Sequence, residues 1–233
     1  MEKVPGEEKE ASAVERAHRS AKVPAAAGIA GIVFAVLFVV SVILLRYQPP
    51  AGSTAQDIAD WYLGQGAGNV ILAGLYLAPF AGIAFLWFIG VIRSRVGTQE
   101  DQFLATVFLG SGLIFIALFF ITAASAGALV AAGKFQNAPT PSPDAVVFAR
   151  SLSFATLLIY GTKAAAVFMI ATSTIGLRTG IFPRWIIYCG YLIALVLIFF
   201  VTYFEAIVLV FPVWVAIISV ILLTAKRPGP SDA

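Results

Sequence analysis

Five charged side chains fall within or beside long apolar segments: Lys163, Glu205, Arg150, Asp57 and Asp60. A charge at the centre of a bilayer costs about 2.5–3.5 kcal/mol on insertion scales, so an intramembrane lysine is expected to have a partner or a function. Ammonium, guanidinium and carboxylate groups offer ion pairing and the binding of small ions. We therefore take these five residues as the candidate polar site.

Lys163 and Glu205 are predicted to lie at nearly the same depth. Lys163 precedes Arg178, the cytoplasmic end of its segment, by 15 residues, which is about 22 Å along a helix. Glu205 falls at the outer tip of the turn at residues 203–206. We predict an ion pair between the two side chains, or a shared water. Two interpretations of Lys163 stay open: it snorkels or fixes helix register, or it contacts a substrate or an ion.

Arg150 is expected nearer the outer surface, where Asp57 or Asp60 can meet it. These acidic residues belong to a predicted short helix in the first outer loop, with Ser53 or Thr54 as its N-cap and Asp57 in its first turn. Its aromatic side chains share one face and suit the headgroup region. The sequence therefore predicts a helix that lies flat at the outer interface.

The residue inventory argues against catalysis and against metal binding. The chain has one cysteine, Cys189, and one histidine, His18, in a polar tail. A disulfide framework, a cysteine-based metal cluster and a haem held by two histidines all need more than that. No Ser/His/Asp set and no pair of carboxylates falls within an apolar segment. We expect no enzyme activity, no metal, no cofactor and no nucleic-acid partner.

Composition identifies the solvent in which these residues are placed. Of the 233 residues, 60% are hydrophobic and 12% are charged, whereas soluble domains carry about 25% charged residues. A bilayer core needs about 20 helical residues per crossing, and helices satisfy their own backbone groups there. Six segments are long enough to be transmembrane helices: residues 24–45, 69–92, 103–132, 146–177, 185–203 and 206–224. The fold class is an all-α, polytopic membrane helix bundle.

Basic residues predict the orientation of this bundle. Eleven lysines and arginines fall on one side of the six segments: Lys3, Lys9, Arg16, Arg19, Lys22, Arg93, Arg95, Arg178, Arg184, Lys226 and Arg227. Only Arg46 and Lys134 fall on the other side. By the positive-inside rule both termini are cytoplasmic and the location is the plasma membrane. We divide the chain into a polar tail (1–23), a six-helix transmembrane domain (24–225) and a short tail (226–233).

Two of the segments, 103–132 and 146–177, are longer than one crossing requires. Thirty helical residues span about 45 Å, so the surplus is expected to protrude on the outer side or to be taken up by tilt. A proline-rich turn joins them, and Asp144 is predicted to cap the second. Pro79 is predicted to kink the helix at 69–92. Pro212 falls near the first third of the helix at 206–224.

Helices in lipid associate through close backbone approach and a few polar contacts. Small residues that can serve this purpose lie at helical spacing in three segments: Gly74, Ala78, Gly82, Gly90, Ala123, Gly127, Ala131, Gly161 and Ala165. Hydroxyl side chains that can bond between helices are also present: Ser111, Thr122, Ser125, Ser151, Ser153, Thr156 and Thr162. These faces fit a compact single-chain bundle and equally a homo-oligomer or a membrane-protein partner.

Three stretches carry a resemblance to a known group. They are DIADWY at residues 57–62, LWFIGVIRSR at 86–95 and ATSTIGLRTGIFPRW at 171–185. Together they resemble six-span integral membrane proteins of unassigned activity from bacteria, many of them high-GC Gram-positive bacteria. The resemblance implies the layout alone, and it assigns no functional residue.

Three classes of function follow. A non-enzymatic membrane component or subunit, with the lipid bilayer as its surroundings, fits the sequence best. A small transporter or channel with a polar site around Lys163 and Glu205 is the alternative, but a pore needs a continuous polar stripe and the segments carry scattered Ser and Thr. A lipid-modifying enzyme ranks last because no catalytic set is found.

Overall fold

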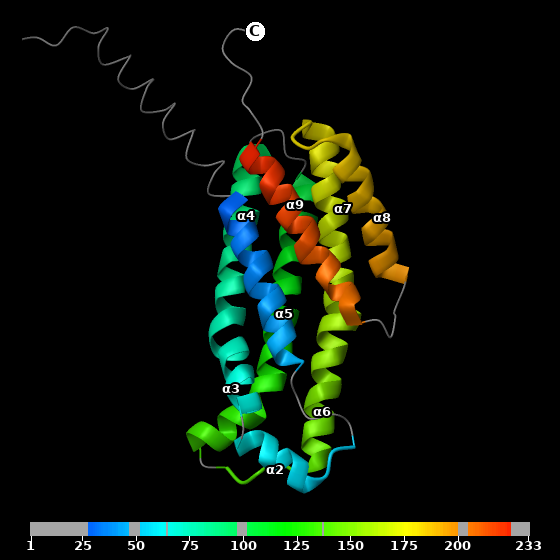
Figure 1. Cartoon of the computed structure of the whole chain (residues 1–233). Helices are drawn as coiled ribbons and strands as arrows, with labels where there is room; N and C mark the ends of the chain where they lie inside the picture. Colours follow the sequence, from blue (N-terminus) through cyan, green and yellow to red (C-terminus); the bar gives the residue numbers. More distant parts are fainter. Residues whose placement is uncertain are drawn as a thin grey trace, which may run out of the picture.

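The computed structural model describes residues 28–46, 52–63, 65–96, 102–136, 138–199 and 205–224. Within these ranges the chain is helical and contains no strand, which confirms the all-α fold class. The helices stand side by side as an elongated bundle (Figure 1). The predictions for the tails at 1–23 and 226–233 lie outside the described residues.

The first helix, Gly28–Leu45, is followed by three short elements and then by longer helices. In chain order they are α2 (Ala55–Leu63), α3 (Gln65–Ile71), η1 (Leu72–Leu77), α4 (Ala78–Val96), α5 (Gln102–Gln136), α6 (Pro143–Phe154), η3 (Ala155–Gly161), α7 (Thr162–Thr179), α8 (Arg184–Phe199), η4 (Glu205–Leu209) and α9 (Val210–Thr224). Eight of these elements continue one another to form three rods, α3–η1–α4, α6–η3–α7 and η4–α9, and each rod covers one predicted segment.

Five helices in the described ranges are long and apolar enough to cross a membrane: Gly28–Leu45, Gly66–Ser94, Gln102–Gln136, Pro143–Thr179 and Ala206–Thr224. They coincide with five of the six predicted segments. The predicted segment at 185–203 forms the shorter apolar helix α8, of 16 residues. Residues 200–204, which complete that segment, lie outside the described ranges.

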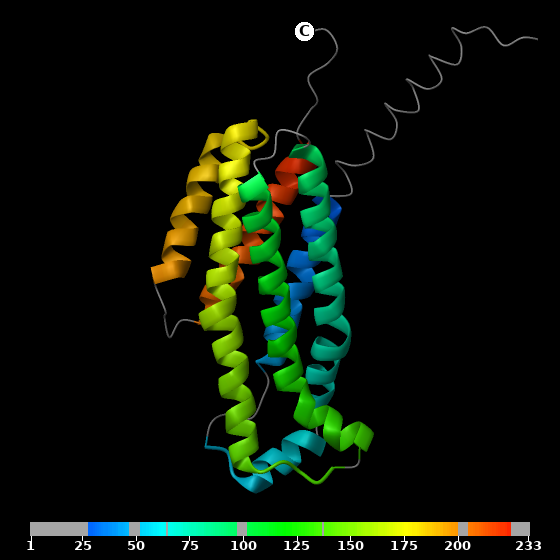
Figure 2. The same cartoon turned by 180° about the vertical axis from the view of Figure 1, so that it is seen from behind.

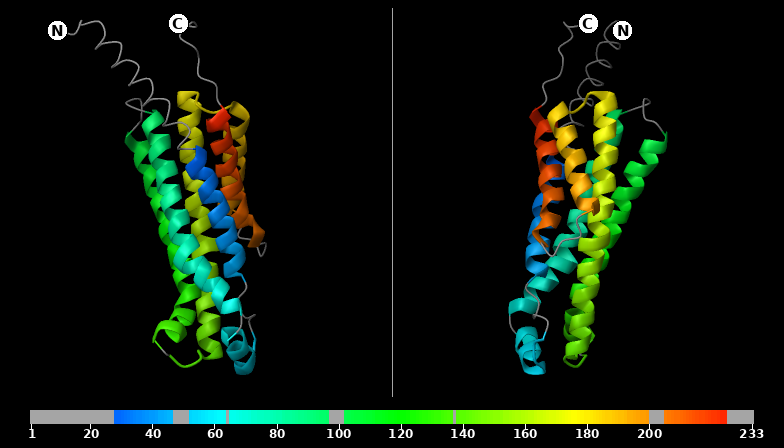
Figure 3. Two further views of the ribbon diagram at one scale, coloured as in Figure 1. Left: turned by 60° about the vertical axis from the view of Figure 1, so that its left-hand side comes forward. Right: turned by 90° about the vertical axis from the view of Figure 1, so that its right-hand side faces the viewer.

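Successive long helices run in opposite directions, so the start of the first helix and the end of α9 lie at the same end of the bundle (Figures 1 and 3). The contact there is close: a Cβ added at Gly28 would collide with the Leu223 side chain. At the opposite end α2 lies across the bundle, and α6 extends well past the ends of α8 and α9. The last turns of α5 bend sideways at this end (Figure 2). Whether this surplus length protrudes on the outer side of a membrane or is taken up by tilt stays a prediction.

Phenylalanine side chains fill the centre of the bundle. Phe85 of α4 lies with its ring centroid 4.5 Å from that of Phe34 in the first helix and 5.1 Å from that of Phe168 in α7. Phe115 of α5 lies 4.7 Å from Phe211 of α9. Tilted and edge-to-face ring pairs of this kind contribute beyond their buried area, so one aromatic cluster joins five helices.

Small residues and hydroxyls also join the helices, as predicted. An ideal Cβ on Gly74 would lie 3.3 Å from the carbonyl oxygen of Ala123, so η1 and α5 approach closely. The hydroxyls of Thr122 and Thr156 share a buried hydrogen bond of 2.8 Å, and the Ser153 hydroxyl donates to the Thr122 carbonyl at 3.2 Å. These bonds attach α5 to α6 and η3. Gly90, by contrast, meets no neighbouring atom.

Two π-helical turns interrupt the rods, and the sequence did not predict them. The turn η1 comes directly before Ala78 and Pro79. Because a proline ring clashes with the carbonyl four residues earlier in an α-helix, a local change to wider turns accommodates it. The turn η3 comes directly before Thr162 and Lys163. Pro212 lies in the first turn of α9, where proline is tolerated.

One predicted cap is wrong. Ser142, not Asp144, is the N-cap of α6: its backbone is extended (φ −66°, ψ 155°) and its hydroxyl accepts a hydrogen bond from the Ala145 N–H at 3.3 Å. Pro143 follows at N1, where its fixed φ suits a helix start. Asp144 lies two residues past the N-cap, in the first turn of α6, where its negative charge favours the positive end of the helix dipole.

Candidate functional site

Lys163 is the second residue of α7 and lies where η3 ends. Its Nζ is buried and has no hydrogen-bond partner among the described residues. With Tyr160, Ala164 and Val167, it lines an open groove of about 580 Å³ against α5, which contributes the Ser111 side chain. The Ser111 hydroxyl already donates to the Val107 carbonyl at 2.6 Å. The ammonium group therefore lies in a nearly apolar groove.

Glu205 begins η4, and its side chain lies outside the described residues. The match in depth between Lys163 and Glu205 stays a prediction. On the neighbouring face of α7, Thr162 and Ala165 line the same small space as Ile207. That face of α7 is not the face that carries Lys163, which turns toward α5. The ion pair between Lys163 and Glu205 stays a prediction, and it requires the lysine stem to reach around α7.

Replacing Lys163 distinguishes a buried lysine without a partner from one that is paired with Glu205. We expect Lys163→Met to unfold at the same temperature as the wild type or higher, because methionine removes a buried ammonium group and keeps its length. Thermal unfolding in detergent measures this. Removing one partner of a buried ion pair is strongly destabilising, by about 3–5 kcal/mol. A large loss of stability, matched by Glu205→Gln and not increased in the double variant, would instead establish the pair.

The short helix α2 and its cap are as predicted, while its place at the outer interface stays a prediction. Thr54 caps α2: its hydroxyl accepts from the Asp57 N–H at 3.2 Å, while Asp57 accepts from the Thr54 N–H at 2.9 Å and from its hydroxyl at 2.7 Å. Ile58 is buried against the rest of the protein, at 1% exposure. Asp60 accepts a hydrogen bond from the Gln56 side chain at 3.0 Å. These bonds of Asp57 and Asp60 are internal to α2, and a contact with Arg150 stays a prediction.

The cap gives α2 a defined response to acid. Hydrogen bonds from the Thr54 hydroxyl and then the Thr54 N–H hold the pKa of Asp57 below its usual value of 3.8. A carboxyl group with a lowered folded-state pKa stabilises the fold above its unfolded pKa, and this contribution is lost as pH falls through the folded value. We expect several-fold faster hydrogen exchange in α2 for Asp57→Asn at neutral pH. This difference from the wild type should disappear below the lowered pKa, and one that persists there would contradict the cap.

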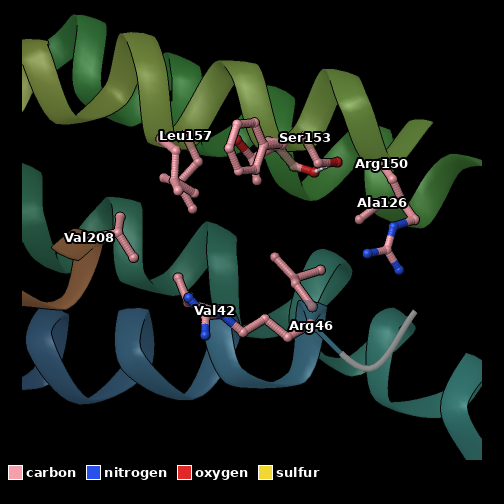
Figure 4. A pocket seen from close by; sticks show the side chains of 11 residues that line it. Val42, Arg46, Ala126, Arg150, Ser153, Leu157 and Val208 are labelled. Atoms are coloured by element: carbon pink, nitrogen blue, oxygen red, sulfur yellow. Dashed lines mark hydrogen bonds between the residues drawn. The ribbon is translucent and has the colours of Figure 1, made fainter. Parts of the chain in front are cut away.

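Arg150 lies half-buried on α6 and lines a pocket of about 140 Å³ that the sequence did not predict. Arg46, the residue after the first helix, faces the same pocket from the opposite wall (Figure 4). The other described residues that line it are Val42, Leu45, Thr122, Ala126, Ser153, Phe154, Leu157, Leu158 and Val208. Two guanidinium groups and mainly apolar side chains thus line this pocket.

From the sequence, Arg46 was only one of the basic residues that predict orientation. Arg150 was expected to meet Asp57 or Asp60, not Arg46. A usable signal was nevertheless present. Both arginines fall at the predicted outer ends of their segments, at 46 and 150, where few other basic residues occur. What the sequence could not show is that the first helix and α6, remote in the chain, form facing walls.

These features describe an all-helical protein whose long apolar helices suit a membrane. No family model, no curated protein and no solved structure matches the chain. Among the described residues no group of three or more His, Cys, Asp or Glu side chains is placed to hold a metal ion.

Proposed function

We propose that this chain is a multi-pass plasma-membrane protein that crosses the bilayer six times, with both termini cytoplasmic, and that it acts as a non-enzymatic component or subunit. The observation that supports the proposal most is that the outward faces of the helices are apolar. Large apolar side chains point away from the bundle along its length, including Val36, Phe80, Leu192 and Val213, all more than half exposed. An apolar surface of this extent is stable in lipid and prone to aggregate in water.

The count of six and the cytoplasmic termini rest on additional reasoning. The 16 residues of α8 span about 24 Å, slightly less than the bilayer core, and local thinning of the bilayer can close that difference. The first helix starts where α9 ends, which suits an even number of crossings. The basic residues then favour the cytoplasm for that end. The resemblance to six-span bacterial membrane proteins supports the same arrangement.

The subunit role is tested by isolation in mild detergent. We expect the protein to purify with a stoichiometric membrane partner or as a homo-oligomer. Cross-linking in intact membranes before extraction keeps weak assemblies together. A chain that is monomeric both in membranes and in detergent would contradict the subunit role.

A second function is favoured by one observation, the buried Lys163 Nζ without a described partner. Such a group in a transmembrane helix is typical of an ion or substrate path. The alternative is therefore a small transporter or channel with its site around Lys163 and Glu205. Proteoliposomes would show anion flux that Lys163→Met abolishes. Equal flux in the two proteins, or none in either, would exclude this alternative.

A further inference from the structure

We propose that the groove between α5 and α7 binds one long-chain fatty acid, and that the Lys163 ammonium group is the partner of its carboxylate. The inference rests on the proposed placement of the chain in a membrane, and it names a ligand class for the Lys163 site. It requires neither the subunit role nor transport.

The charge of Lys163 calls for an anion. Its Nζ is buried and has no hydrogen-bond partner among the described residues. A buried ammonium group without a partner is costly, and an opposite charge beside it offsets much of that cost. The Ser111 hydroxyl on the opposite wall donates to the Val107 carbonyl at 2.6 Å, and a neutral hydroxyl does not balance the charge. A carboxylate in the groove would supply what the ammonium lacks.

The position of Lys163 allows it to reach such a ligand. The side chain as a whole is half-buried and borders the groove, while its terminal Nζ is covered. Because the four-carbon stem of lysine is flexible, rotations about its bonds can present Nζ to a group that lies in the groove. The π-helical turn η3 ends at Gly161, just before Thr162 and Lys163. Such turns within α-helices frequently lie at functional sites.

The dimensions of the groove suit a single acyl chain. Its described lining residues all belong to α5, η3 and α7, and Figure 2 shows these helices side by side. On α5 the lining runs from Val107 to Leu118, about 16 Å along the helix. A cavity of about 150 Å³ holds benzene, so the groove of about 580 Å³ has room for roughly twenty carbon atoms. A phospholipid with two chains is too large for this volume.

The groove also has a polar and an apolar end. Tyr160 and Lys163 lie at the end nearer α6, whereas Val107 and Val167 lie toward the end of the bundle where α9 ends. The proposed membrane placement puts the α6 end outside. A fatty acid of the outer leaflet has its carboxylate outward and its chain toward the bilayer centre, which is the same direction.

The test is ligand binding to the full chain, purified in a neutral detergent and measured by native mass spectrometry and thermal stabilisation. The probes are palmitic acid, hexadecanol with the same chain length, acetate and phosphatidylglycerol. We expect one palmitate per chain and at least about tenfold weaker binding of the other three. Lys163→Met should weaken palmitate binding at least about tenfold, because it removes a charge-assisted contact. It should leave hexadecanol binding unchanged.

Gly110→Leu is an independent variant that leaves Lys163 in place. Gly110 lines the groove, and a Cβ added there meets no atom within 4 Å, so the leucine can occupy the groove without a clash. It should weaken both palmitate and hexadecanol. Gly90→Leu on α4 is the matched control, since a Cβ there also meets no atom within 4 Å and Gly90 is not among the lining residues. If Lys163→Met does not fold, this pair of variants decides the outcome.

Several results would overturn the proposal: palmitate binding that is unchanged in Lys163→Met, equal palmitate binding in Gly110→Leu and Gly90→Leu, or any of the other three probes binding as tightly as palmitate. Matching losses of stability in Lys163→Met and Glu205→Gln would also overturn it, because the ammonium would already have a carboxylate. A protein that stays soluble without detergent would contradict the proposed membrane placement. Failure of the detergent-purified protein to bind palmitate would contradict the ligand alone.

Discussion

Phe85→Ala is expected to lower the stability of the bundle by about 3–5 kcal/mol, the usual range for removing a buried aromatic ring. Phe85 is fully buried, and its ring neighbours come from four other helices: Phe34, Phe115, Phe168 and Phe211. In lipid the loss arises mainly from van der Waals packing, because transfer from water does not drive helix association. For a chain of this size the unfolding temperature should fall by on the order of 10 °C.

The matched control is Phe148→Ala on α6, where the same atoms are removed from a side chain that is 69% exposed. Its unfolding temperature should stay close to that of the wild type. Thermal unfolding in detergent, followed by the loss of monodisperse protein, measures both variants. Equal shifts for Phe85→Ala and Phe148→Ala would contradict the aromatic cluster as the centre of the fold.

Val36→Arg is expected to prevent stable insertion of the protein. Val36 lies midway along the first helix and points outward, at 57% exposure. An arginine at the centre of a transmembrane helix costs about 2.5–3.5 kcal/mol on the insertion scale, which corresponds to a shift of about a hundredfold in the insertion equilibrium. The yield of folded protein in the membrane fraction should fall accordingly.

Val147→Arg makes the comparison specific for lipid. Val147 is also exposed, at 44%, but it belongs to the first turns of α6, at the end of the bundle that extends beyond α8 and α9. The proposed membrane placement leaves this end outside the hydrocarbon, so an arginine there should be tolerated. Equal yields for Val36→Arg and Val147→Arg would mean that the first helix does not face lipid.

Much of the fold could be predicted from the sequence because each long apolar segment folds independently of its neighbours. Helix ends were marked by charges and caps, as with Thr54 and Asp57 in α2. The aromatic cluster could not be predicted. Segments such as α5 are apolar on every side, so periodicity does not distinguish the face with Phe115 from the face that is exposed.

The candidate site was predicted less well, for a related reason. A depth for Lys163 follows from counting residues along one helix, and it stays a prediction. The direction of its side chain depends on how α7 is rotated about its axis relative to α5 and η4. Counting residues along one helix gives no information on that rotation. The pocket of Arg46 and Arg150 was missed because it requires two remote helices to be neighbours.

The central claim is that the chain crosses the membrane an even number of times with its basic ends inside the cell. Topology reporters test this claim most directly. A reporter active only in the cytoplasm, fused after Arg227, should be active, and one active only outside should be silent at the same position. The pattern should reverse for fusions after Gln136, the end of α5. A reporter after Arg227 that is active only on the outer face, or a protein that remains soluble without detergent, would contradict the account.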